Sequence, residues 1–179
     1  MNAARRLRWV LGINPGPHDG SAALLRDGRL CAMAEQERFS RTKAAPWQPP
    51  TDAIASCLGR AGIGLDELAG IALSANLDLL HPDEQRAFHR TQPPHGRIDD
   101  PDVLFPADRF PRRTLPPIHP YPHHLAHAAS SFRISGYEEA AVVTLDDRGE
   151  DASATIAHGC RSFAGTGVSC EVGGSEGVG

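Results

Sequence analysis

The first 35 residues constrain the fold most, because short apolar runs alternate there with turn signals. Asp27-Gly28 separates two of the runs, and this dipeptide favours a two-residue hairpin turn because both positions accept positive φ. The earliest run ends in a segment rich in Pro and Gly, which predicts a loop. The three runs cover residues 9–13, 21–25 and 30–34. The chain therefore begins with a predicted strand, a loop and a β-hairpin.

Helices and strands alternate after this start, which predicts an α/β fold. A helix is expected from Thr51 or Asp52, either of which can cap it, to about residue 60, with Gly62 as its stop. Residues 70–74 are apolar and strand-like. A second helix is expected over residues 123–134, with its packing face supplied by apolar residues at helical spacing. The last predicted strands cover residues 140–145 and 152–157.

Two segments interrupt this pattern. Residues 77–120 contain nine prolines and show no period, which predicts a long irregular insertion. Residues 159–179 contain seven glycines and no helix signal. We interpret them as an irregular tail, either flexible or produced by a shifted reading frame, and we favour the frameshift. The predicted organisation is one lobe over residues 8–158 followed by that tail.

Composition excludes several classes of protein. The chain is 40% apolar and 22% charged with a net charge of -4, so no basic surface for nucleic acid is expected. No apolar stretch reaches the length of a membrane span. The four cysteines are scattered without a paired spacing, which is typical of reduced thiols. We expect a soluble, cytoplasmic protein without nucleic-acid or membrane partners.

The strongest local signal for chemistry is the HxxxH spacing of His123 and His127. On a helix, positions i and i+4 share one face, so both imidazoles can bind one metal ion. Asp146, at the end of a predicted strand, is placed to add a carboxylate. Two histidines and a carboxylate suit iron(II) or zinc with open positions for substrate. The alternative is a pair of solvated helix histidines, since an isolated HxxxH is common in a chain with nine histidines.

Two further segments carry candidate residues. His18 lies in the Gly- and Pro-rich turn after the first strand, where it can act as an acid or a base, or be only a turn residue. Lys43 ends a dense run of charges at residues 35–43, where it can neutralise a phosphate or carbamate group. The alternative for this run is a solvated edge.

Taken in order, these segments resemble one family. The stretches HDGSAALLRDGRL, AEQERFSRTK, HHLAHAASSF and VVTLDDRGE are similar to the N-terminal half of the O-carbamoyltransferases that modify nodulation factors and antibiotics. The resemblance implies a partial actin/hexokinase-like ATPase lobe of the ribonuclease H-like type, with a mixed sheet and flanking helices. It also implies transfer of a carbamoyl group from carbamoyl-adenylate, made from carbamoyl phosphate and ATP, to a hydroxyl of a small acceptor.

The resemblance assigns roles residue by residue. His123, His127 and Asp146 match the family's ligands for an iron-type divalent metal, whose fourth ligand lies much later in family chains. His18 and Lys43 fall on its N-terminal active-site motifs, where they imply activation of the acceptor hydroxyl and stabilisation of an anion. Asp147 departs from the family's glycine at that position, and Ala44 from its histidine.

Three hypotheses follow. The first is a truncated O-carbamoyltransferase with a partial site and little activity alone, which a separately encoded C-terminal half could complete. The second is a non-catalytic remnant or binding module of the same fold. The third is a sugar-kinase-like member of the ATPase superfold, which would have no use for HxxxH.

Overall fold

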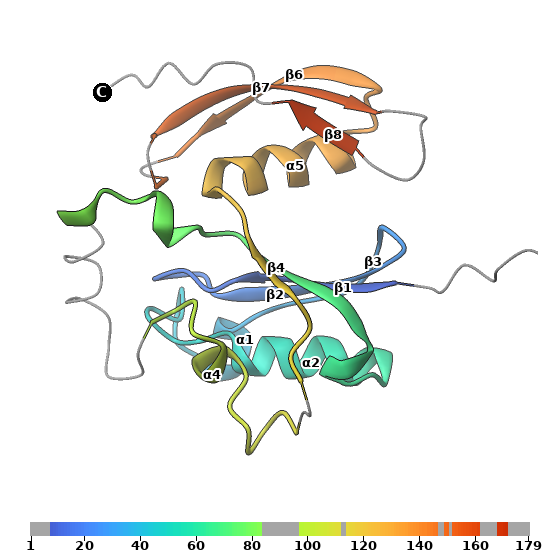
Figure 1. The fold of residues 1–179 in the computed structure, drawn as a ribbon, viewed down its shortest axis with the longest axis vertical. Coiled ribbons are helices and arrows are strands. Elements are labelled where there is room, and N and C mark those ends of the chain that lie inside the picture. Colours follow the sequence, from blue (N-terminus) through green and yellow to red (C-terminus); the bar gives the residue numbers. More distant parts are fainter. Residues whose placement is uncertain are drawn as a thin grey trace, which may run out of the picture. The chain divides into compact units, whose positions relative to one another are not determined.

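The chain forms two compact units in a computed structural model that describes residues 8–83, 97–111, 114–146, 149–150, 152–161 and 168–171. The first unit consists of Met1–Ala75 and Arg86–Pro120, and the second of Asn76–Gln85 and Tyr121–Gly179. Figure 1 shows both, coloured along the sequence. Each unit has its own sheet and its own helices.

A five-stranded mixed sheet forms the first unit, in the order β3-β2-β1-β4-β5. The hairpin predicted at Asp27-Gly28 is present, and both residues have positive φ, 49° and 79°. β1 pairs antiparallel with β2 and parallel with β4, while β4 pairs parallel with β5. The strands are β1 (Trp9–Asn14), β2 (Ser21–Arg26), β3 (Arg29–Glu35), β4 (Leu68–Leu73) and β5 (Ile118–Pro120).

The helix α2 (Thr51–Ala61) covers one face of this sheet (Figure 1). It ends at Gly62, which has a φ of 67°, as the sequence predicts. Its start differs from the prediction, because neither Thr51 nor Asp52 caps it. The cap position is Pro50, and the side chain of Gln36, from just before the short helix α1 (Glu37–Ser40), accepts the first-turn N–H groups instead.

The proline-rich segment is more ordered than its composition predicts. It includes the short helix α4 (Pro101–Leu104) and the edge strand β5. Leu104 and Phe105 are fully buried in the same hydrophobic cluster as the sheet and α2. Residues 101–104 and 118–120 of the expected irregular insertion therefore form regular structure. A three-residue strand cannot display a period, so only its pairing with β4 reveals it.

The second unit packs α5 (His123–Ser135) on one face of an antiparallel sheet, in the order β6-β7-β8 (Figure 1). Gly159 gives Phe132 room on the packed face, since a Cβ there would lie 2.6 Å from the Phe132 ring. Regular structure continues past residue 158, beyond the expected end of the lobe. The strands are β6 (Glu139–Leu145), β7 (Ala154–Arg161) and β8 (Val168–Glu171), and the short 3-10 helices are η1 (Leu65–Glu67) and η2 (Leu77–Leu79).

The expected fold class is confirmed, since the chain is α/β with a mixed sheet and flanking helices. Asp147, which replaces the family's glycine, lies outside the described residues. Over the part of the chain that is described, no helix combines the length and the apolar character needed to cross a lipid bilayer.

Candidate metal centre

The helix α5 presents two histidines from one face. His123 and His127 lie one turn apart, with ring centroids 4.5 Å apart and ring planes at 90°. Their Nε2 atoms are 3.0 Å from each other. The spacing that suggested a metal site in the sequence therefore brings two imidazole nitrogens to one point.

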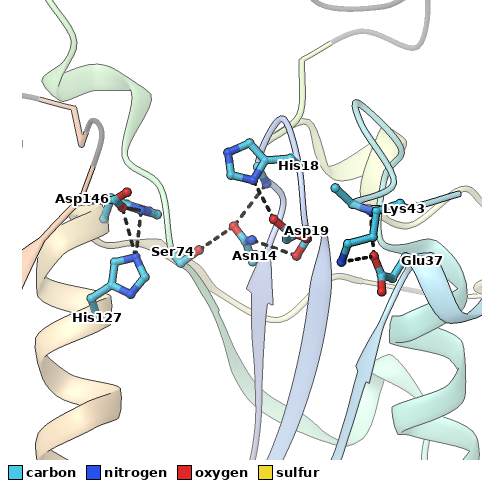
Figure 2. Close-up of polar contacts among 11 residues, drawn as sticks. Asn14, His18, Asp19, Glu37, Lys43, Ser74, His127 and Asp146 are labelled. Atoms are coloured by element: carbon cyan, nitrogen blue, oxygen red, sulfur yellow. Dashed lines mark hydrogen bonds and ion pairs between the residues drawn. The ribbon is translucent and has the colours of Figure 1, made fainter.

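Asp146 completes the group from the end of β6. Its Oδ2 atom lies 2.9 Å from Nε2 of His123 and 3.4 Å from Nε2 of His127. Figure 2 shows His127 and Asp146 facing one another. The backbone N–H of Asp146 donates to the carbonyl of Ser153, 2.9 Å away, which fixes the residue where the strand ends. These three residues form the metal-type cluster of the described chain, with their ligand atoms within 4.8 Å of one another.

The spacing of these atoms fits a bound divalent ion. Ligands at about 2.0–2.2 Å from a metal lie about 2.9–3.5 Å from one another in octahedral or tetrahedral geometry. The three measured separations of 2.9, 3.0 and 3.4 Å fall in that range.

The side chains of all three residues are partly exposed, so a metal ion here would keep open positions. The exposed fractions are 29% for His123, 52% for His127 and 32% for Asp146. Two histidines and one carboxylate on one face of a metal leave the remaining positions for substrate or water. The cluster can therefore support chemistry in addition to structure.

Glu150 supports the cluster and received no role from the sequence. It is buried, with Oε2 accepting the backbone N–H of His123 at 2.8 Å and Oε1 accepting that of Asn76 at 2.8 Å. The only signal in the sequence was its place four residues after Asp146, within the quoted VVTLDDRGE stretch. Burial and two acceptor contacts appear only in the folded chain.

His18 lies in the first unit, in the loop between β1 and β2. Its Nδ1 is 2.9 Å from Oδ2 of Asp19, and the ring is largely exposed. Asn14 shapes this loop, since its Nδ2 donates to the carbonyl of Asp19 and its Oδ1 accepts from the Ser74 hydroxyl (Figure 2). An imidazole oriented through Nδ1 leaves Nε2 directed elsewhere, the arrangement a general base needs.

Lys43 lies in a neighbouring loop of the same unit. Its Nζ is 3.1 Å from Oε2 of Glu37, which also accepts the backbone N–H of Ala44 at 2.7 Å (Figure 2). The hydrogen bond from Ala44 and then that from Lys43 hold the pKa of Glu37 below its ordinary value. Glu37 therefore holds the Lys43 loop in place.

The backbone around Lys43 is strained. Residues in the left-handed region cost about 1–3 kcal/mol each unless they are glycine, and such strain is typical of functional loops. The loop is tied to the His18 loop by two backbone hydrogen bonds, from Asp19 to Ala44 at 2.6 Å and from Trp47 to Pro17 at 2.7 Å. The structure thus brings the His18 and Lys43 segments together. The left-handed residues are Arg41, Ala44, Ala45 and Trp47, with φ of 59°, 59°, 42° and 58°.

Residues 9–87 match the family model described as the carbamoyltransferase N-terminus. These residues belong to this family. The match covers the first unit's His18 and Lys43 segments and ends before the metal-type cluster. It confirms the resemblance drawn from the sequence motifs.

Longer relatives share the similarity. The nodulation protein NolNO of Sinorhizobium fredii is 33% identical over 147 residues, which cover 79% of this chain and 21% of the relative. An uncharacterized protein of Synechocystis is 33% identical over 164 residues, which cover 82% of the chain and 26% of the relative. The chain spans about a fifth to a quarter of the length of these relatives.

Solved structures that show some similarity to this chain include YeaZ from Pseudomonas aeruginosa. It is 21% identical with a TM-score of 0.48, and the match covers 94% of this chain and 65% of YeaZ. A second structure from the same organism, described as similar to peptidase YeaZ, is 21% identical with a TM-score of 0.47, over 94% and 64% of the two chains.

Proposed function

We propose that this chain is the metal-binding, acceptor-activating part of an O-carbamoyltransferase. The observation that carries the proposal is the convergence of His123, His127 and Asp146 in a member of the carbamoyltransferase family. The donor would be carbamoyl-adenylate, made from carbamoyl phosphate and ATP. The acceptor would be a hydroxyl of a sugar or antibiotic-like small molecule.

The transfer is an acyl substitution. The acceptor oxygen attacks the carbamoyl carbon, a new C–O bond forms, and the bond from that carbon to the phosphate oxygen of the adenylate breaks. AMP leaves with the electron pair of that bond. The proton of the acceptor hydroxyl moves to Nε2 of His18, whose Nδ1 is held by Asp19.

Positive charge must be supplied where oxygen atoms gain negative charge. Lys43 would provide part of it for the phosphate or carbamoyl oxygens, with Glu37 fixing its loop. His123, His127 and Asp146 would hold iron(II) or another divalent ion, which polarises a substrate oxygen when bound. The remaining catalytic parts would come from the C-terminal portion, in the same or a separately encoded chain.

Metal binding by the purified chain tests the first part of the proposal. Iron(II) under anaerobic conditions and cobalt(II) should bind the wild-type protein in a one-to-one ratio, measured by titration and elemental analysis. Replacement of a ligand in His127→Ala or Asp146→Asn should weaken binding at least about a hundredfold.

His158→Ala is the matched control, because His158 also faces a carboxylate, with Nε2 2.8 Å from Oε1 of Glu139, but belongs to no cluster of three metal-ligating side chains among the described residues. This variant should bind cobalt as the wild type does. Equal loss of binding in His158→Ala and His127→Ala would show that the converging trio is not the metal site.

Carbamoyl transfer tests the second part. The chain, alone and mixed with the separately expressed C-terminal portion of NolNO, is incubated with carbamoyl-adenylate and a panel of hydroxylated sugars. Mass spectrometry should detect a carbamate ester and AMP in equal amounts, lost in Asp146→Asn and strongly reduced in His18→Ala. Metal binding without transfer under both conditions would favour the non-catalytic binding module.

A further inference from the structure

We infer that Glu150 is a positioning residue that sets the geometry of the three ligands before the metal binds. This role rests on the metal site of the proposed function and extends it to a residue outside the three candidate ligands. The starting point is the way α5 begins. Its cap position is Pro122, which provides no side-chain hydrogen bond, so the first turn lacks a local cap.

Glu150 replaces that local cap from a distant part of the chain. Its Oε2 accepts the N–H of His123, the first residue of the helix and itself a ligand. Its Oε1 accepts the N–H of Asn76 from a third segment. A carboxylate accepts with both oxygens and is favoured at a helix N-terminus, so one buried side chain joins three segments.

Glu150 also belongs to the connection that carries the other ligand. Asp146 and Gly149 lie in the same connection between β6 and β7. Two backbone hydrogen bonds bridge it: the N–H of Asp146 donates to the carbonyl of Ser153 at 2.9 Å, and that of Gly149 to the carbonyl of Ala152 at 2.8 Å. The bond from His123 to Glu150 therefore ties the helix that carries two ligands to the connection that carries the third.

A second contact constrains the distance between the first turn of α5 and the connection from β6 to β7. His124 is 6% exposed, and a Cβ on Gly149 would lie 3.0 Å from its Nε2 and Cδ2 atoms. Gly149 thus lies against His124 in the first turn of α5, at a position where an added Cβ would force a neighbouring group to move. Together, the contact at Gly149 and the bond to Glu150 determine how far Asp146 lies from His123.

Preorganisation of the three ligands raises the affinity of the site for the metal. When only a fraction of molecules hold all three ligands correctly, the apparent dissociation constant rises by the inverse of that fraction. Groups that orient metal ligands typically change affinity by about 10- to 100-fold when removed. Glu150→Gln keeps the shape but places an N–H₂ donor against one of the two backbone N–H groups.

The experiment compares cobalt(II) binding and its visible absorption spectrum in the wild-type chain, Glu150→Gln, Gly149→Ala and Gln36→Ala. Gln36→Ala is the matched control, because Gln36 caps α2 from a distance in the first unit and touches no ligand. Thermal unfolding of the metal-free proteins is measured in parallel. Glu150→Gln and Gly149→Ala should bind cobalt about tenfold or more weakly, with a changed spectrum.

Gln36→Ala should melt at a lower temperature but bind cobalt with wild-type affinity and spectrum. Wild-type affinity and spectrum in both Glu150→Gln and Gly149→Ala would overturn the inference while leaving the metal site intact. Equal weakening by Gln36→Ala would also overturn it, since the effect would then follow stability alone. Failure of the wild-type chain to bind cobalt would overturn the metal site itself, and the role of Glu150 with it.

Discussion

The two long helices begin in the same way and serve different purposes. Both α2 and α5 follow a proline at the cap position and have no local side-chain cap. Gln36 accepts two first-turn N–H groups of α2, at 3.1 and 3.3 Å, whereas Glu150 accepts one from α5 and one from another segment. The first cap closes a single helix end, and the second joins the segments that carry the candidate ligands.

The two units also differ in the apolar side chains that their long helices bury. In the first unit, α2 buries Ala53, Ile54, Cys57 and Leu58. These side chains belong to a hydrophobic cluster that also contains apolar residues from four strands. In the second unit, α5 buries only His124, Ala128 and Phe132. The outward face of β6 and β7 is exposed, with Val143 at 60%, Leu145 at 79% and Ile156 at 62%. Among the described residues, the candidate site thus lies on the unit with fewer buried apolar side chains.

The largest effect is expected from Phe132→Ala, which removes the main apolar contact of the second unit. We expect it to lower the free energy of unfolding of that unit by about 3–5 kcal/mol, through lost transfer energy and a cavity. Segment-resolved amide hydrogen exchange should place the loss in α5, β6 and β7. Ile54→Ala is the control and should place a comparable loss in α2 and the first sheet. Equal loss of protection across both units in either variant would contradict the assignment of separate hydrophobic packing to the two units.

A smaller effect is expected from Gly159→Ala, which overpacks the same contact. The added Cβ would lie 2.6–2.8 Å from three atoms of the Phe132 ring, so the ring or the strand must move. We expect a cost of about 1–3 kcal/mol in urea unfolding. In a Phe132→Ala background the same change should cost little, because the clashing ring is gone. Additive losses would show that Gly159 acts through something other than Phe132.

Gln36→Ala should cost about 0.5–2 kcal/mol, the range for loss of a helix cap. The N–H groups of Asp52 and Ala53 lose their acceptor in a largely buried position. Thermal unfolding measures the loss, and the exchange rates of these two amides should rise first. Unchanged protection at both amides would contradict the role of Gln36 as a distant cap.

The smallest effect is a pH dependence carried by Glu37. Its pKa is lowered from 4.5 in the folded chain, so the folded state binds fewer protons there than the unfolded state. Its contribution is complete above pH 4.5 and is lost as pH falls through the lowered pKa. The difference in unfolding midpoint between the wild type and Glu37→Gln should therefore shrink between pH 6 and pH 3. A constant difference over that range would contradict the assignment.

Features that depend on residues close together in the sequence could be predicted without the structure. The Asp27-Gly28 hairpin, the stop of α2 at Gly62 and the helix that carries His123 and His127 all follow from local backbone preference and helical period. The i, i+4 spacing already placed two imidazoles on one face. The family resemblance also rested on short, continuous sequence motifs.

The contacts between distant segments could not be predicted and depend on the folded chain. The edge strand β5 is too short to show a period and exists because β4 supplies its hydrogen bonds. Gln36 and Glu150 became caps because folding buried them beside helix ends 16 and 27 residues away in the sequence. A side chain that caps a distant helix is defined by its position in space. A local sequence pattern contains no information about that position. The sequence thus named the candidate ligands, and the fold supplied the residues that hold them in place.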